Sequence, residues 1–155
     1  MSAEGEAAVG RIAIWAAHVE QGLVDLCASL INSNFEVGYA VTANMSASSM
    51  IQLAKKLVSE SETASAKNKA HTLAALTEAK AALEQRNKIL HAAVGSSLEK
   101  DKTAFYNSRR KKAPAAAGKL PQLEVAFHGL EDLDEIGARL YRSHEDLWEC
   151  VFLLA

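Results

Sequence analysis

The sequence contains few of the residues that interrupt helices. Only 2 prolines and 8 glycines occur among its 155 residues, whereas alanine, leucine, glutamate and lysine are abundant. Proline and glycine are the residues least compatible with a helix interior, and unbranched side chains lose little rotamer freedom there. The composition therefore predicts a mostly helical protein. The length fits one domain, residues 1–155, with a substantial hydrophobic core.

The chain also lacks an excess of charge of either sign. It has 17 lysines and arginines against 19 acidic residues, a formal net charge of −2. No global positive field attracts nucleic acid or anionic lipid, so any polyanion must be held by a local patch. The first residues are acidic where a signal peptide would be basic, and His18 and Glu20 break the apolar run after Arg11. We therefore expect a cytoplasmic protein that does not enter a membrane.

Motifs for common cofactor and metal chemistry are missing. The sequence has no P-loop, no GxGxxG fingerprint, no nucleophile elbow and no CxxC pair. His144 and Glu145 begin like the zinc motif HExxH, but Trp148 stands where the second histidine would be. The only cysteines, Cys27 and Cys150, lie in apolar helical runs and are expected to be buried free thiols. The sequence thus predicts neither a metal site nor a cofactor.

Apolar residues recur every three or four positions in four stretches, which predicts four amphipathic helices. The first is expected at residues 6–31, and the second begins after a cap at Asn44 or Ser46 and ends near Ser61. The third begins between residues 63 and 67 and ends at Gly95, and the fourth runs from residue 130 to the C-terminus. Residues 35–43 are interpreted as a connector.

The apolar period changes between the third and fourth predicted helices. Residues 104–106 and the alternating Leu123, Val125 and Phe127 predict two short strands that flank a loop. The expected fold class is therefore all-α: an antiparallel four-helix bundle with a short β-hairpin or long loop inserted before the last helix.

One motif in the third predicted helix stands out, Arg86-Asn87-Lys88-Ile89-Leu90-His91. Arg11 with His18, and Arg139 with His144, match only a looser pattern, an arginine followed five to seven residues later by a histidine. In both of these copies an apolar residue, not a polar one, follows the arginine. The stricter pattern, Arg-Asn-x3-His, resembles the active-site motif of the HEPN superfamily. These are small α-helical bundles that occur as RNases, toxins and RNA-processing domains. The predicted helix arrangement, with the motif late in the third helix, is similar as well.

Helix geometry places Asn87 and His91 on one face, one turn apart, and directs Arg86 toward the neighbouring apolar stripe. An always-charged guanidinium that is buried requires a compensating anion or acceptors. Glu84, Glu20 or a bound phosphate could serve, and the alternative interpretation is that Arg86 is a satisfied structural residue.

The resemblance implies metal-free RNA cleavage, in which the ribose 2′-OH attacks the adjacent phosphorus. Imidazole titrates near neutral pH, so His91 could act as base or acid, but one imidazole cannot be both at once. The resemblance implies a homodimer that pairs two motifs across a two-fold axis. Arg86 would then stabilise charge on the phosphate, and Asn87 would hold a phosphate oxygen or orient His91.

Two further features concern partners. The basic run Arg109, Arg110, Lys111 and Lys112 could clamp an RNA backbone, although a solvated loop is an equally good interpretation. Surplus apolar residues beside the stripes of the first and last helices predict a symmetric homodimer. These residues are Trp15, Ile136, Tyr141 and Trp148.

The sequence leaves two hypotheses open. The first is a HEPN-like endoribonuclease of the toxin or defence type that acts as a homodimer, with an antitoxin as a candidate partner. The second is a non-catalytic HEPN-like helical dimer that binds a protein partner or a nucleotide and keeps the motif for structure.

Overall fold

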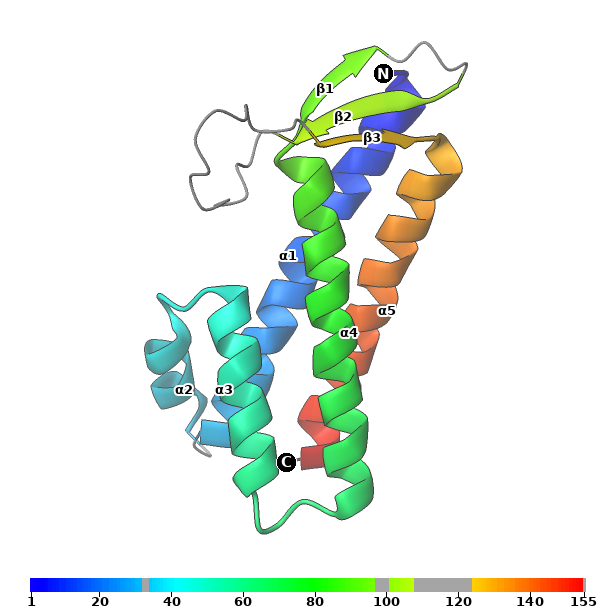
Figure 1. Cartoon of the computed structure of the whole chain (residues 1–155). Coiled ribbons are helices and arrows are strands. Elements are labelled where there is room, and N and C mark those ends of the chain that lie inside the picture. Colours follow the sequence, from blue (N-terminus) through cyan, green and yellow to red (C-terminus); the bar gives the residue numbers. More distant parts are fainter. Residues whose placement is uncertain (32–33, 97–100, 108–123, 155) are drawn as a thin grey trace, which may run out of the picture.

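Five helices and one three-stranded sheet make up the described part of the chain (Figure 1). The computed structural model describes residues 1–31, 34–96, 101–107 and 124–154. The elements are α1 (Ala3–Ile31), α2 (Phe35–Thr42), α3 (Ala47–Glu60), α4 (Ala66–Leu90), β1 (Ala93–Ser96), β2 (Thr103–Asn107), β3 (Glu124–His128) and α5 (Leu130–Leu154). The prediction of a mostly helical protein with strands inserted before the last helix is confirmed.

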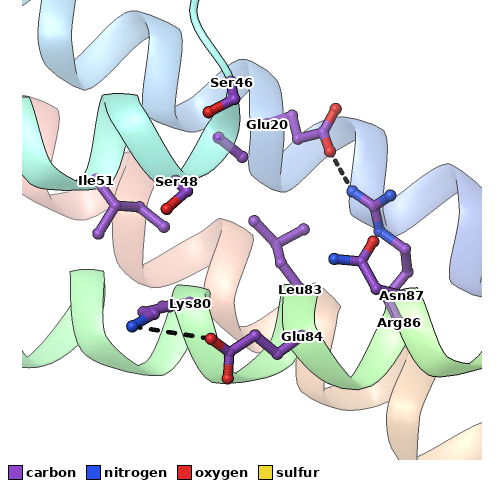
Figure 2. A pocket seen from close by; sticks show the side chains of 10 residues that line it. Glu20, Ser46, Ser48, Ile51, Lys80, Leu83, Glu84, Arg86 and Asn87 are labelled. Atoms are coloured by element: carbon purple, nitrogen blue, oxygen red, sulfur yellow. Dashed lines mark hydrogen bonds and ion pairs between the residues drawn. The ribbon is translucent and has the colours of Figure 1, made fainter. Parts of the chain in front are cut away.

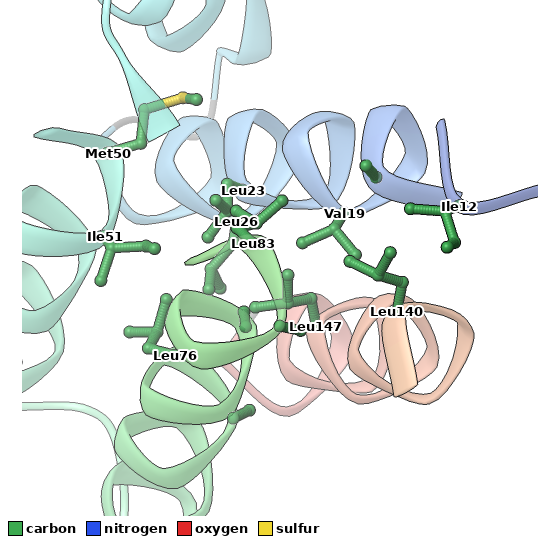
Figure 3. Close-up of a cluster of buried hydrophobic side chains, with 14 of the residues drawn as sticks. Ile12, Val19, Leu23, Leu26, Met50, Ile51, Leu76, Leu83, Leu140 and Leu147 are labelled. Carbon is green, nitrogen blue, oxygen red and sulfur yellow. The ribbon is translucent and has the colours of Figure 1, made fainter. Parts of the chain in front are cut away.

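The core lies between the long helices α1, α4 and α5, and α3 covers one side of it (Figure 3). Ile12, Val19, Leu23 and Leu26 of α1, Met50 and Ile51 of α3, Leu76 and Leu83 of α4, and Leu140 and Leu147 of α5 are buried there. Burying one such side chain stabilises the fold by roughly 1.5–3 kcal/mol. The predicted apolar stripes are therefore the faces that form the core. Both cysteines are buried free thiols, as predicted.

A polar clamp made by Arg139, Glu78 and Gln85 fixes how α4 packs against α5. Arg139 of α5 donates from Nε to Glu78 Oε1 at 2.5 Å and from a terminal nitrogen to Glu78 Oε2 at 3.0 Å. It also donates to the side-chain oxygen of Gln85 at 3.0 Å. The hydrogen bond from Arg139 lowers the pKa of the Glu78 carboxyl. A forked pair of this kind fixes geometry more than a single contact can.

Serine caps begin α3 and α4. The Ser46 hydroxyl accepts from the backbone N–H of Ser49 at 3.2 Å, and the Ser65 hydroxyl accepts from that of Asn68 at 3.1 Å. Each cap satisfies one of the N–H groups that a helix start leaves unpaired. Of the two predicted caps for the second amphipathic helix, Ser46 is the one used.

The predicted connector at residues 35–43 is wrong, because this stretch is helix α2. The Asn34 side chain caps it by accepting from the Glu36 N–H at 3.0 Å. With 8 residues, α2 is too short to show a helical period in sequence. It is held by a close approach at Gly38, where an added Cβ would lie 2.4 Å from the Cα of Ala28 in α1.

The chain after α4 also differs from the prediction. Helix α4 ends at Leu90, with His91 as its cap, and Gly95 lies within strand β1, where a Cβ would meet the Tyr106 ring at 2.5 Å. The strands pair antiparallel in the order β1-β2-β3. The two predicted strands are confirmed as β2 and β3, but β1 was missed. Asn107 of β2 donates its side-chain amide to the Lys88 carbonyl at 3.2 Å, which ties the sheet to the end of α4.

The structure also bears on the predictions about membranes and about the apolar surface. No helix in the described ranges has an apolar stretch long enough to cross a membrane. Of the four residues predicted to form a surplus apolar patch, Ile136 is instead buried in the core at 2% exposure, while Tyr141 and Trp148 are exposed.

A pair of glycine substitutions tests the docking of α2. Gly38→Ala should destabilise the protein by about 1–3 kcal/mol, because its methyl group must push α2 away from the Ala28 backbone. Gly10→Ala in α1 is the control: a Cβ there meets no atom within 4 Å, so it should stabilise by about 0.5–1 kcal/mol through helix propensity. Urea unfolding measures both. Equal effects at the two sites would contradict the close approach.

Candidate functional site

Arg86 lies near the end of α4, with its guanidinium directed toward α1. Its side chain is only 14% exposed and forms an ion pair with Glu20 (Figure 2). The expectation that a buried Arg86 needs a compensating anion is therefore met by Glu20. Glu84, the other carboxylate considered, lies 3.8 Å from Lys80 on the same helix instead. The charge of Arg86 is thus balanced across two helices.

A pocket of about 230 Å³ opens beside this ion pair, where the start of α3 meets α1 and α4 (Figure 2). Arg86 and Asn87 line it side by side. The remaining lining residues are Glu20, Ser46, Ala47, Ser48, Ile51, Lys80, Leu83 and Glu84. The structure therefore brings together two of the three predicted motif residues in one concave site.

The third motif residue, His91, is not part of the pocket lining. It caps the C-terminus of α4, where its backbone N–H donates to the Asn87 carbonyl at 3.3 Å, and it is exposed. Four residues along a helix separate Asn87 from His91, so they follow one face as expected. The chain thus holds Arg86 and Asn87 at the pocket and presents His91 one turn further along α4.

The electrostatics of the pocket are mixed. The N-terminus of α3 favours negative charge, and the Ser46 and Ser48 hydroxyls lie at that end. Lys80 and Arg86 add two cations, which Glu20 and Glu84 oppose. The buried Nε of Arg86 has no hydrogen-bond partner among the residues that the structure describes. The pocket therefore combines charges of both signs with room for a small polar group.

Sequence reasoning missed three polar residues of this pocket: Ser46, Ser48 and Lys80. The capping pattern at Ser46 was recognisable in the sequence. It shows where a helix begins, but not which other helix that start packs against. Lys80 could have been grouped with Asn87 on one face of α4, because the two are seven residues apart. What joins them to the motif is the docking of α3 on α4, which the local sequence does not encode.

The two looser copies of the motif serve other contacts. Arg11 pairs with Asp134 at 2.6 Å, and Arg139 forms the clamp with Glu78. The rings of His18 and His144 pack against each other in a tilted arrangement, with their centroids 5.3 Å apart. None of these four motif residues lines the pocket beside Arg86. The stricter pattern is thus the copy that contributes two neighbouring residues, Arg86 and Asn87, to this pocket.

The predicted RNA-binding residues Arg109, Arg110, Lys111 and Lys112 lie outside the described residues. Nowhere in the described ranges do three or more histidine, cysteine or acidic side chains converge to hold a metal ion.

The ion pair at the pocket can be tested with matched carboxylate substitutions. Glu20→Gln should destabilise the protein by roughly 1–3 kcal/mol, because it removes the negative charge opposite a largely buried guanidinium. Glu84→Gln is the control, since its pair with Lys80 is exposed and should contribute about 0.3–0.5 kcal/mol. Chemical denaturation compares the two. A Glu20 variant as stable as the Glu84 variant would show that solvent, not Glu20, balances Arg86.

Comparison with known protein families, with curated proteins and with solved structures finds no significant match to this chain. The interpretation of the site therefore depends on the geometry of Arg86, Asn87 and His91 and on the resemblance carried by their spacing.

Proposed function

We propose that this chain is a HEPN-like, metal-independent endoribonuclease of the toxin or defence type that acts as a homodimer. The observation that carries the proposal is the placement of Arg86 and Asn87 side by side in a polar pocket, with His91 exposed one turn further along α4. In this view α1, α3, α4 and α5 correspond to the four-helix bundle and α2 is an addition to it, although α1 and α5 run parallel and α4 runs opposite to them, which differs from the expected antiparallel arrangement.

The proposed reaction is an internal transfer within the RNA. A base removes the proton of the ribose 2′-OH, whose oxygen attacks the adjacent phosphorus while an acid protonates the leaving 5′-oxygen. The products are a 2′,3′-cyclic phosphate and a 5′-hydroxyl. Arg86 would stabilise the charge that develops on the phosphate oxygens. Asn87 would hold a phosphate oxygen or orient His91.

A homodimer would supply the second imidazole that this chemistry needs. His91 of one protomer would act as base and His91 of the other as acid. The exposed position of His91 at the end of α4 suits this role, because an exposed helix end can approach a second copy. The composite site would then contain Arg86, Asn87 and His91 from both protomers.

A second candidate function is supported by a different observation. Arg86 is already paired with Glu20, and His91 is outside the pocket that Asn87 and Arg86 line. A non-catalytic HEPN-like dimer would keep the ion pair for structure and use the pocket or its surroundings to bind a protein partner, such as an antitoxin, or a nucleotide. In that case the pocket would bind ligand without cleaving RNA.

RNA cleavage distinguishes the two functions. His91→Ala should reduce cleavage by about 10²-fold or more, as loss of a general acid–base group typically does. His71→Ala is the control, because His71 is also exposed on α4 but lies near its other end. Cleavage should persist in chelator and leave a 2′,3′-cyclic phosphate. A wild-type protein that binds but cleaves none of a panel of single-stranded and structured RNAs would favour the non-catalytic function.

The basic run should govern RNA affinity more than cleavage rate. Replacing Arg109, Arg110, Lys111 and Lys112 with serine should weaken binding and flatten the dependence of affinity on salt, because fewer counterions are released. Fluorescence anisotropy of labelled RNA at several salt concentrations measures the slope. An unchanged slope would show that this run does not contact RNA.

A further inference from the structure

An exposed aromatic surface runs along the outer side of the α1–α5 pair. We call it the aromatic face, and its residues are Trp15, His18, Tyr141, His144, Trp148 and Phe152. The Trp15 and Tyr141 rings are 4.7 Å apart between centroids, and those of Trp148 and Phe152 are 5.3 Å apart. Tyr141, Trp148 and Phe152 are 42%, 48% and 64% exposed. A contiguous aromatic surface of this kind marks an interface, because aromatic residues are enriched at interface cores.

The aromatic face lies on the opposite side of α1 from the Arg86 pocket. Successive residues of an α-helix are rotated by about 100°, so His18 and Glu20 point about 200° apart. His18 stacks on His144 of α5, whereas Glu20 pairs with Arg86 of α4. A dimer through the aromatic face therefore cannot bring two copies of His91 together. It is a different contact from the one that a composite cleavage site needs.

The α5 side of the face is complementary to itself. A pocket of about 200 Å³ is lined by Arg11, Trp15, Asp134, Gly137, Ala138 and Tyr141. Its centre on α5, at residues 137–138, lies six or seven residues before His144, and the protruding Phe152 lies eight residues after it. At 1.5 Å per residue, these offsets are about 10 Å and 12 Å. A two-fold axis near His144 would place Phe152 of each copy over the pocket of the other.

On the α1 side of the face, two opposite charges lie at equal distances on either side of His18, so this side is also complementary to itself. Arg11 and Asp25 lie seven residues before and seven residues after His18. Antiparallel packing of α1 on a second α1 about His18 would bring Arg11 of each copy opposite Asp25 of the other. Arg11 is half exposed in its pair with Asp134, and Asp25 accepts from two neutral groups, Gln21 at 3.0 Å and the Tyr39 hydroxyl at 2.9 Å. The Arg11 guanidinium and the Asp25 carboxylate can therefore each form an additional ion pair with a second chain.

We propose that a second copy of this chain docks on the aromatic face, antiparallel, about a two-fold axis near His18 and His144. Phe152 of each copy would fill the pocket beside Gly137 of the other. The two sides of the face place this axis at the same level, since His18 and His144 stack within each protomer. The proposal does not depend on RNA cleavage, and the experiments that test it measure only association.

Sedimentation equilibrium at micromolar concentration tests the docking of Phe152. The wild-type chain should associate through this face, into tetramers if the α4 ends also pair and into dimers if they do not. Phe152→Ala and Ala138→Trp should each weaken this association by about tenfold or more, the first by removing the inserted ring and the second by filling its pocket. Phe35→Ala on α2 is the control, because Phe35 is also exposed, at 41%, but is not part of the face. A wild-type mass of 16.6 kDa, or a Phe152 variant that associates as tightly as the Phe35 variant, would overturn the proposal.

Disulfide trapping tests the position of the axis. His18→Cys should form covalent dimers under mild oxidation, because two residues on the axis face each other within the reach of a disulfide. Ala17→Cys is the control, exposed but rotated by about 100°. The native thiols should not compete, since burial raises the pKa of Cys27 to about 11 and raises that of Cys150. Equal trapping at positions 17 and 18 would contradict the axis, whether or not the protein cleaves RNA.

Discussion

The packing of α1 against α5 is the contact on which the remaining architecture depends. The two helices run parallel, with Trp15 beside Tyr141 and His18 beside His144 (Figure 1), and at Gly22 an added Cβ would be in van der Waals contact with Leu147 at 3.4 Å. Helix α1 buries one continuous stripe through Ile12, Val19, Leu23 and Leu26. This stripe packs against α3, α4 and α5. The packing therefore fixes the rotation of α1 about its own axis, and with it the directions of the other faces of α1. One of these faces carries Glu20, and the opposite one carries Trp15 and His18.

Two arginines then complete the arrangement of α4. Arg139 of α5 donates two hydrogen bonds to the carboxylate of Glu78 on α4. Arg86 of α4 forms an ion pair with Glu20 of α1. Hydrophobic contacts are tolerant of small rotations, but paired charges in a partly buried setting are not, because an unmatched buried charge is costly. The two ion pairs therefore restrict the rotation of α4 about its axis. This restriction is what places Asn87 beside the start of α3.

The sequence predicted the long helices because their apolar residues recur at helical spacing, and it predicted β2 and β3 because apolar residues alternate there. It missed α2 and β1, which are too short to show a period, and the contacts that hold them come from Ala28 and Tyr106, in the neighbouring elements α1 and β2. The burial of Ile136 was missed because α5 covers a wider arc of the core than its main stripe suggested. At the site, the need of Arg86 for an anion followed from its own chemistry. The choice of Glu20 over Glu84, and the presence of Ser46 and Lys80, depended on how the helices dock.

The hydrogen bond from Asn107 to the Lys88 carbonyl has a mechanical consequence. It joins the last strand residue before the basic run to the turn of α4 that lies between Asn87 and His91. Arg109 follows Asn107 by two residues. A pull on the chain at Arg109 would thus reach Asn107 two residues earlier. The hydrogen bond from Asn107 to the Lys88 carbonyl would then pass it to the end of α4 that carries the motif. This link from the end of β2 to the helix end that carries His91 involves no residue of the hydrophobic core.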